Sequence, residues 1–431
     1  MGLIVDLFAG GGGASEGIRM ALGRDPDVAI NHNDETLAMH LANHPSTHHL
    51  HGDVWHYRPR EVVGDQSVDL LWCSPTCTHF SKAKGAPLDR RQATRIRALA
   101  WVAVRWAREA RPKVIMVENV EPFAAWGPLA ADGRPCPRRK GTTFRRWVRA
   151  LEAEGYRVEW RELAACDYGA PTSRKRLFVI ARRDGMPVVW PSPTHGRGLL
   201  PHRTAEECID WTIPVPSIFG KKKPLVRNTL ARIARGIQRY VIDNPKPFLV
   251  QDAMPFLIQT GYGERKGQPP RVLDLHAPLG TVVAGGVKHA LVAAFIARHY
   301  GGNENDGAPL VRPLPTITTQ DHHALVLTAF GRERRAEVET FLAEFSVRHT
   351  PTLFNSASTG FQIVDIGMRM LTPRELFRAQ GFPESYVIDP IHNGKRLSAT
   401  AQVRMCGNSV CPNVAAAIVL ANLGQQNEVA A

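Results

Sequence analysis

Short apolar runs alternate with helical patterns through the first 180 residues of the chain. Each run holds three to six residues, mostly Val, Ile and Leu, and leads into a polar residue, glycine or proline. Apolar runs of this length between helical segments are typical of strands buried on both faces of a parallel sheet. We therefore predict an α/β fold with a Rossmann-like sheet. The predicted strands are Leu3–Phe8, Val28–Ile30, Val68–Trp72, Val114–Val117 and Leu177–Ile180.

The first predicted strand leads directly into a glycine turn at Gly10–Gly13. Glycines at this place let the backbone approach a ligand closely, although a tight strand-to-helix turn alone would also use them. Phe8 lies at the end of the strand, where its ring face can contact a cation. A sulfonium cofactor, S-adenosylmethionine, therefore fits this turn better than NAD does.

Two reactive side chains follow the next central strands. Cys77 lies in a loop after Pro75, just beyond the strand at 68–72, and Glu118 directly follows the strand at 114–117. A buried structural cysteine and a carboxylate at a helix start are the alternative interpretations. Open α/β sheets bind ligands at the carboxyl ends of their strands, so we expect both residues at one site. A thiolate and a buried carboxyl are what attack on C6 of a cytosine ring requires.

Composition agrees with a nucleic-acid partner. The 431 residues include 54 basic and 40 acidic ones, which gives a net charge of +14 and favours a polyanion. No run of 18 apolar residues and no signal peptide is evident, so we expect a cytoplasmic protein with no membrane partner. The seven cysteines form no C-x-x-C pair, so we expect neither a metal site nor a disulfide framework.

Seven segments, in order along most of the chain, resemble the cytosine-C5 DNA methyltransferase family. They include the glycine turn, an adenine-contacting segment, a nucleophile loop and a cytosine-clamping triplet. Any one match is weak, but seven in the right order are specific. The segments are Asp6–Gly13, Gly52–Val54, Pro75–Ser81, Glu118–Val120, Tyr168–Arg176, Arg369–Pro383 and Gly407–Val410.

The resemblance implies methyl transfer from S-adenosylmethionine to C5 of a cytosine in double-stranded DNA. Cys77 would add to C6 of the flipped base, and Glu118 would bind N3 and the exocyclic amine. Arg176 would hold O2 with Arg174 as its support, both on one face of a strand. The residues implied to bind the cofactor are Phe8, Gly10, Gly11, Gly13, Asp34, Asp53, Val54, Pro75, Leu99, Asn408 and Ser409. For Leu99, core packing is the alternative role.

The chain departs from the family pattern near these residues. Thr76 and Thr78 flank Cys77 where the family has a proline and a glutamine, and Thr172 replaces the glutamine of a Q-x-R-x-R segment. His32 occupies the place of the acid expected to bond the cofactor ribose, which leaves Asp34 as the candidate. These differences affect how the loop enters the duplex and how the ribose is held.

Residues 81–91 combine glycine, proline and four cations. This composition predicts a mobile loop that closes over phosphates, with an ordinary solvated loop as the alternative. A helical pattern follows from Gln92 to Arg111. The candidate DNA-binding residues are Ser81, Lys82, Lys84, Arg90 and Arg91.

The resemblance also divides the chain. Residues 1–188 form the first part of a catalytic domain, 189–362 an inserted, β-rich target-recognition domain, and 363–431 the segment that completes the catalytic domain. An imperfect repeat in the insert offers two polar linkers, 284–288 and 318–323, for contacts in a DNA groove, although a duplicated scaffold is the alternative.

Two other functions fit the same scaffold. An RNA cytosine methyltransferase is one, and the long insert argues against it. A catalytically silent DNA-binding regulator is the other, and the intact Cys77, Glu118 and Arg176 argue against that. A cognate restriction endonuclease as partner and a monomeric state complete the expectations.

Overall fold

The computed structural model describes residues 2–76, 90–130, 135–244, 250, 253–260, 267–299, 334–348 and 360–424. The chain forms two compact units. Unit 1 comprises Met1–Arg203, Gly280–Gly286 and Pro373–Ala431, and unit 2 comprises Thr204–Leu279 and Val287–Thr372. The predicted insert, 189–362, differs from unit 2 at both ends and by the segment 280–286, which belongs to unit 1.

Unit 1 is built on a seven-stranded sheet in the order β3-β2-β1-β4-β5-β7-β6. The strands from β3 to β5 are parallel, and β7 is antiparallel to both β5 and β6. This arrangement confirms the predicted Rossmann-like α/β fold. The strands are β1 (Leu3–Leu7), β2 (Val28–Asn31), β3 (His48–His51), β4 (Val68–Cys73), β5 (Val114–Asn119), β6 (Arg157–Ala164) and β7 (Lys175–Arg182).

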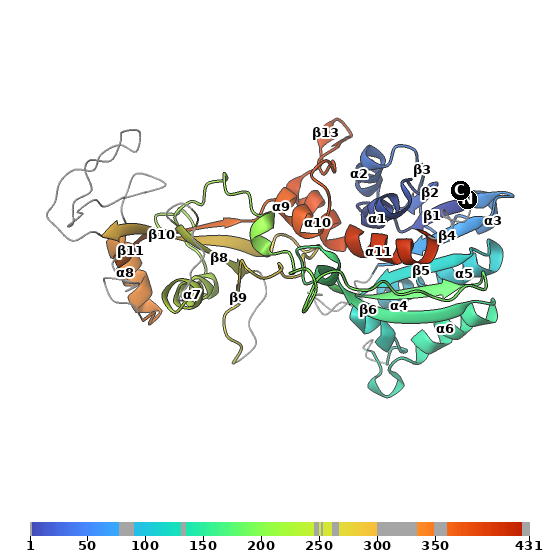
Figure 1. Ribbon diagram of the computed structural model, residues 1–431, viewed down its shortest axis with the longest axis horizontal. Helices are drawn as coiled ribbons and strands as arrows, with labels where there is room; N and C mark the ends of the chain where they lie inside the picture. The colour runs from blue at the N-terminus through green and yellow to red at the C-terminus, as the bar shows by residue number, and fades with distance from the viewer. Residues whose placement is uncertain are drawn as a thin grey trace. The chain divides into compact units, whose positions relative to one another are not determined.

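Helices cover both faces of this sheet, which explains why its central strands are apolar. Every residue of β4 and β5 is buried. On one face α1 (Gly13–Leu22) and α11 (Pro412–Leu423) lie side by side (Figure 1), so close that a Cβ on Gly17 would be 2.5 Å from that of Ala415. On the other face, α5 (Trp101–Glu109) and α6 (Thr142–Ala153) bury Trp106 and Trp147.

The remaining elements of unit 1 connect these layers. The predicted helix from 92 to 111 is two helices, α4 and α5, which meet at Leu99 and Ala100. The stretch Ala399–Leu423 reaches the length and hydropathy of a membrane span, but 67% of its apolar window is buried, as in a core helix. These elements are α2 (Asp34–Asn43), α3 (Pro59–Val63), α4 (Arg90–Ala98), η1 (Glu121–Ala125), η2 (Pro137–Arg139), η3 (Ala165–Tyr168), α9 (Pro373–Ala379), β12 (Ile391–His392), β13 (Lys395–Arg396) and α10 (Ala399–Asn408).

Unit 2 contains an antiparallel sheet in the order β11-β10-β8-β9. Its core joins Ile233, Phe256 and Phe341 from the helices and the sheet. Residues 318–323, one of the two predicted groove linkers, lie outside the described part of the chain. The elements are η4 (Ala205–Cys208), α7 (Arg227–Gly236), η5 (Ile237–Ile242), β8 (Ala253–Gln259), β9 (Val272–Leu273), β10 (His289–His299), α8 (Arg335–Glu344) and β11 (Gly360–Met370).

Candidate active site at the carboxyl ends of the central strands

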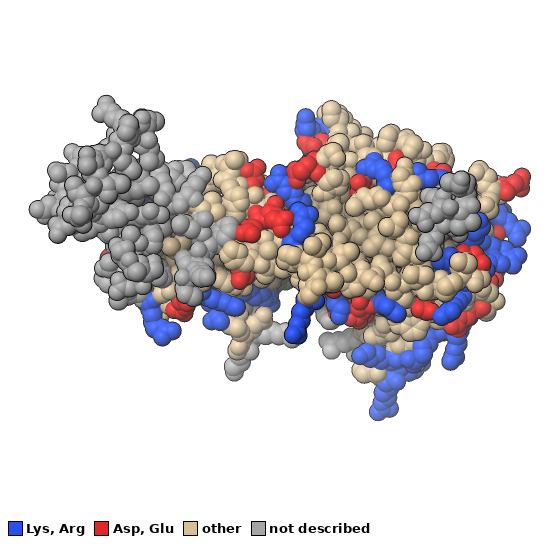
Figure 2. Space-filling model, viewed as in Figure 1, with Lys and Arg blue, Asp and Glu red and all other residues tan. Residues whose placement is uncertain are grey.

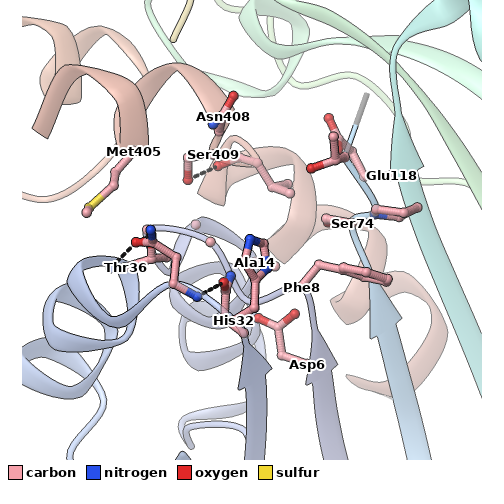
Figure 3. A pocket seen from close by; sticks show the side chains of 18 of the residues that line it. Asp6, Phe8, Ala14, His32, Thr36, Ser74, Glu118, Met405, Asn408 and Ser409 are labelled. Atoms are coloured by element: carbon pink, nitrogen blue, oxygen red, sulfur yellow. Dashed lines mark hydrogen bonds between the residues drawn. The ribbon is translucent and has the colours of Figure 1, made fainter. Parts of the chain in front are cut away.

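A cavity of about 490 Å³ lies at the carboxyl ends of β1, β2, β4 and β5. Here β1 and β4 flank the point where the strand order reverses, which is where open α/β sheets bind ligands. In Figure 3, Phe8, His32, Ser74 and Glu118 approach the cavity from the strand side, and Asn408 approaches from across it. The predicted site residues that line it are Phe8, Gly10, Gly11, Gly13, Asp53, Val54, Pro75, Leu99, Glu118, Arg174, Arg176, Asn408 and Ser409.

The glycine turn packs closely against the protein at Gly13 but not at Gly10. A Cβ on Gly13 would lie 2.1 Å from the Val410 carbonyl oxygen, so no other residue fits there. A Cβ on Gly10 would meet nothing nearer than the Phe8 carbonyl oxygen at 3.9 Å, so packing does not demand this glycine. Gly10 nevertheless lines the cavity, and its missing side chain leaves room for a ligand.

Phe8 holds a strained backbone at the edge of the same turn. Its φ is 61°, in the left-handed region that bulky residues avoid, at a cost of about 1–3 kcal/mol. The Tyr386 hydroxyl donates a 2.8 Å hydrogen bond to the Gly11 carbonyl oxygen and thereby helps to hold the glycine turn in place. Strain of this kind persists where the surroundings enforce it, and here it sets the ring at the cavity wall.

Asp6 is a cavity residue that the sequence analysis did not single out. It is 1% exposed, and one carboxyl oxygen accepts a 2.8 Å hydrogen bond from the Ser15 hydroxyl, while Oδ1 has no partner among the residues that the structure describes. Burial raises the pKa of Asp6 to about 7, and the Ser15 hydrogen bond opposes that rise. Ser15 also bonds His40, whose pKa burial lowers well below its usual value. A buried chain of hydrogen bonds therefore runs from His40 through Ser15 to Asp6, a residue that lines the cavity.

The end of β2 requires a correction. Asp34 does not line the cavity; it begins α2, its side chain is 61% exposed, and it lies 3.6 Å from His392. Asn33, one residue earlier, caps α2 by accepting from the Thr36 amide, and this cap turns Asp34 outward. His32 lines the cavity instead, at the very position where the family pattern places an acid.

Glu118 and Arg176 form the charged wall of the cavity. Glu118 Oε1 lies 3.3 Å from Arg176 Nε, and both side chains are largely buried. Burial raises the pKa of Glu118, and the charges of Arg176 and Arg174 oppose that rise. Glu118 therefore holds its proton to a higher pH than an exposed glutamate does.

Arg174 lines the cavity with Arg176 and also binds three backbone carbonyl oxygens. Its guanidinium donates to the carbonyl oxygens of Val282, Gly407 and Ser409 at 3.2, 3.1 and 2.8 Å. It thereby ties the carboxyl end of α10 and the segment 280–286 to the start of β7. Thr172, the residue in place of the family glutamine, is fully buried and accepts from the Arg174 amide at 3.3 Å.

The segment before the predicted nucleophile is held by β5. Asn119 Nδ2 donates a 2.9 Å hydrogen bond to the Pro75 carbonyl oxygen, and Pro75 and Thr76 line the cavity. Cys77, Ser81, Lys82 and Lys84 lie outside the described residues, so their roles remain predictions. Arg90 begins α4, and Arg91 is exposed on the same helix.

Several cavity residues were missed because their signals are short. Asp6 interrupts an otherwise apolar strand, and an Asn-x-x-Thr cap marks Asn33, so both could have been found. Nothing in the pattern of α10 marks the residues just before Asn408. The missed residues are Asp6, Ala14, Asn31, Asn33, Thr36, Ser74, Arg404, Met405 and Val410.

Cys166, Asp167 and His202 form a group with metal-ligand spacing elsewhere in unit 1. Their ligand atoms lie within 4.8 Å of one another. Hydrogen bonds account for this cluster, since Asp167 Oδ1 lies 3.6 Å from the Cys166 thiol and 3.1 Å from His202 Nε2. Burial, reinforced by Asp167, raises the pKa of the Cys166 thiol to about 11, which disfavours the thiolate that a metal would need.

The strand order, the glycine turn and the buried carboxyl define a Rossmann-like methyltransferase fold with an additional β-rich unit. The family model described as C-5 cytosine-specific DNA methylase matches residues 3–207 and 316–422, and the chain belongs to this family.

Relatives in sequence agree with this assignment. The chain is 30% identical over 200 residues to the type II methyltransferase M.AgeI of Thalassovita gelatinovora, and 26% identical over 228 residues to M.AquIA of Picosynechococcus. These alignments cover 45% and 49% of this chain, and 42% and 88% of the relatives.

Two solved structures share the fold at low identity. A DNA modification methyltransferase encoded within an E. coli prophage matches with a TM-score of 0.52 at 17% identity, covering 98% of this chain and 99% of that one. Spodoptera frugiperda DNMT2 matches with a TM-score of 0.51 at 16% identity, covering 96% and 97%.

Proposed function

We propose that the chain transfers a methyl group from S-adenosylmethionine to C5 of cytosine in double-stranded DNA. One observation carries this proposal: the glycine turn, Glu118 and Arg176 line a single cavity, and the segment that leads to Cys77 lines it too. Family membership supports the same reaction. The cytoplasm is the place we propose for this reaction, as the sequence predicts.

The residues of the cavity fit the cofactor. Asp6 has a buried oxygen without a partner in the described part of the chain, and the missing side chain of Gly10 leaves room for a ligand. Phe8 offers a ring face suited to a cation, and Asn408 and Ser409 supply polar atoms from across the cavity. When bound, S-adenosylmethionine would supply the methyl group, and Asp53, Val54 and His32 would line the rest of its site.

The protein groups would prepare the cytosine for reaction. C5 is a poor nucleophile until a group adds to C6, so the Cys77 thiolate forms a bond to C6 and the ring becomes an enamine that is nucleophilic at C5. Glu118, whose pKa burial raises, would donate to N3 in its protonated form while charge develops there. Arg176, 3.3 Å from Glu118, holds O2. After methylation the C5 proton is lost to a base, and the bond to Cys77 breaks.

The cytosine ring is inaccessible inside a duplex, so the base must be flipped into the cavity. The predicted cationic loop from Ser81 to Arg91 would close over the neighbouring phosphates. Choice of the target sequence is assigned to the insert, 189–362, because base edges must be read by side chains in a groove.

Sequencing of methylated bases tests the activity directly. The chain is expressed in bacteria that lack cytosine methylation, and their DNA is sequenced after bisulfite conversion. We expect 5-methylcytosine at one defined sequence, and none with Glu118→Gln. A genome without 5-methylcytosine, together with methylated cellular RNA, would instead support the RNA-directed alternative.

A further inference from the structure

A cluster of cations lies on unit 1 outside the cavity, on η2 and the outer face of α6. We call it the α6 basic surface, and all of its residues are exposed. In the view shared by Figures 1 and 2, Lys and Arg gather at the lower edge of unit 1, where α6 lies. The surface consists of Arg138, Arg139, Lys140, Arg145, Arg146 and Arg149.

Acidic residues are missing from this stretch of the sequence. Residues 133–151 contain seven Lys or Arg and no Asp or Glu. No cation of the α6 basic surface forms an ion pair with an acidic residue in the described part of the chain. Neighbouring arginines behave differently: Arg108 pairs with Glu154 at 2.9 Å and Arg157 with Glu159 at 2.8 Å. The α6 basic surface therefore carries uncompensated positive charge.

The surface is held rigidly by the core beneath it. Phe144, Trp147 and Leu151 on the opposite face of α6 are buried. The η2 segment packs on Gly127, where a Cβ would meet the Arg139 carbonyl oxygen at 2.1 Å. The Phe144 amide donates to the Trp126 carbonyl oxygen at 3.0 Å. The backbone that carries the cations is therefore held in place, so less conformational entropy is lost when they bind a partner.

This placement of charge is unfavourable for the helix itself. Arg145 and Arg149 are one turn apart, as are Arg146 and Arg149, and like charges at these spacings repel. The amino-terminal end of a helix also disfavours cations, and the first turn of α6 has no acidic residue. An external polyanion would relieve both effects.

The α6 basic surface adjoins the helix that follows the predicted nucleophile loop. Arg97 of α4 donates to the Gly127 carbonyl oxygen, and Gly127 contacts Arg139. The α4 helix begins at Arg90 and carries the exposed Arg91 and Arg95. A polyanion that meets the loop could thus continue along one basic face of unit 1.

We propose that the α6 basic surface binds the phosphate backbone of duplex DNA that flanks the target site. This choice of partner rests on the proposed function. Binding to a lipid surface would require an exposed apolar face, whereas the apolar face of α6 is buried in unit 1. Phosphate contacts of this kind position a protein without reading sequence.

Binding to a duplex of about 30 base pairs without the target sequence tests the proposal. The variant is Arg145→Gln, Arg146→Gln and Arg149→Gln combined. The matched control combines Arg58→Gln, Arg60→Gln and Arg108→Gln, exposed arginines of unit 1 that have local partners. The affinity is measured by fluorescence anisotropy across a salt series.

We expect the variant to bind about tenfold more weakly near 0.1 M salt and to lose about 2–3 from the slope of log K against log salt. The control should change by less than about twofold. Unchanged S-adenosylmethionine binding by calorimetry shows that the variant is folded. An unchanged slope and affinity would overturn the proposal, as would equal weakening in the control. An anionic vesicle or polyglutamate that competes better than the duplex would overturn the partner.

Cys136 gives an independent readout. It is a partly exposed thiol beside η2, and its pKa is lowered chiefly by a hydrogen bond with Arg139. We expect duplex DNA to slow the alkylation of Cys136 by at least about fivefold. Mass spectrometry of the peptide that contains Cys136 measures this rate. Protection should be lost in the triple variant. Equal alkylation with and without DNA would contradict the proposal, even if no methyl transfer is detected.

Discussion

Glu118 is the residue whose environment says most about the chemistry. Burial raises its pKa against the opposing charges of Arg176 and Arg174, which favours the protonated form that would donate to N3. We expect Glu118→Gln to slow methyl transfer by at least about a hundredfold and to leave DNA binding within a fewfold. The rate should fall as the pH rises through the raised pKa. Single-turnover rates across pH measure both effects.

Glu121→Gln is the matched control for this change, because Glu121 lies three residues further on, at the start of η1. It should keep both the rate and the pH profile. Near-normal turnover in Glu118→Gln would show that another carboxyl acts on the base.

Asp6 predicts a pH dependence of stability. Its folded pKa of about 7 exceeds the ordinary 3.8, so the protonated form is favoured in the fold. The stability from this group is full below about pH 4 and is lost as the pH rises toward 7, by about 4 kcal/mol at most. Asp6→Asn should therefore gain stability relative to the parent as the pH rises from 5 to 8. Urea unfolding at both values measures it, and an unchanged difference would refute the assigned pKa.

Gly10 and Gly13 have different roles: Gly10 leaves room for a ligand, whereas Gly13 is required by close packing. We expect Gly10→Ala to keep or slightly raise the melting temperature, because an alanine fits there, and to weaken S-adenosylmethionine binding by about tenfold. Gly13→Ala should destabilise the protein, because its Cβ would meet the Val410 carbonyl oxygen at 2.1 Å. Calorimetry and thermal unfolding distinguish them. Tight binding by Gly10→Ala would remove the cofactor from this part of the cavity.

At the scale of elements, the apolar runs predicted the central strands well. β4 and β5 are buried along their whole length, and all their residues except Asp69, Glu118 and Asn119 are apolar, so most positions carry the signal. The helix predicted from 92 to 111 is divided at Leu99 and Ala100, because a short break leaves the apolar period intact. The prediction for Asp34 failed for a local reason, because the Asn33 cap turns that side chain outward. The hydrogen bond between Ser15 and Asp6 joins two elements, so only the fold reveals it.

A hydrogen bond joins β5 to the segment before Cys77, and we expect its loss to lower the rate of methyl transfer without weakening cofactor binding. Asn119 Nδ2 donates to the Pro75 carbonyl oxygen at 2.9 Å in a buried setting. Asn119→Ala should free the segment leading to the nucleophile and lower the rate of methyl transfer about tenfold or more, with cofactor affinity little changed. Single-turnover kinetics and calorimetry separate the two. A loss of cofactor affinity equal to the loss of rate would mean that the bond supports the whole cavity.

At the scale of the molecule, the order of the segments carried more information than any one of them. The residues that line the cavity come from both ends of the chain, Asp6 and Ser409 among them, and only the fold brings them together. The chain continues from unit 1 into unit 2 and back, and the short return at Gly280–Gly286 was not foreseen. Its carbonyl at Val282 accepts from Arg174, an interaction that no local pattern could predict.

Covalent trapping at Cys77 tests the central claim most directly. A duplex with 5-fluorocytosine at the target site is incubated with the protein and S-adenosylmethionine, and the adduct is mapped by peptide mass. Fluorine at C5 cannot leave as a proton, so the bond to C6 should persist, on Cys77 alone. Cys77→Ser should form no adduct, whereas Cys136→Ser should form it normally. An adduct that survives in Cys77→Ser, or that maps to another residue, would contradict the account.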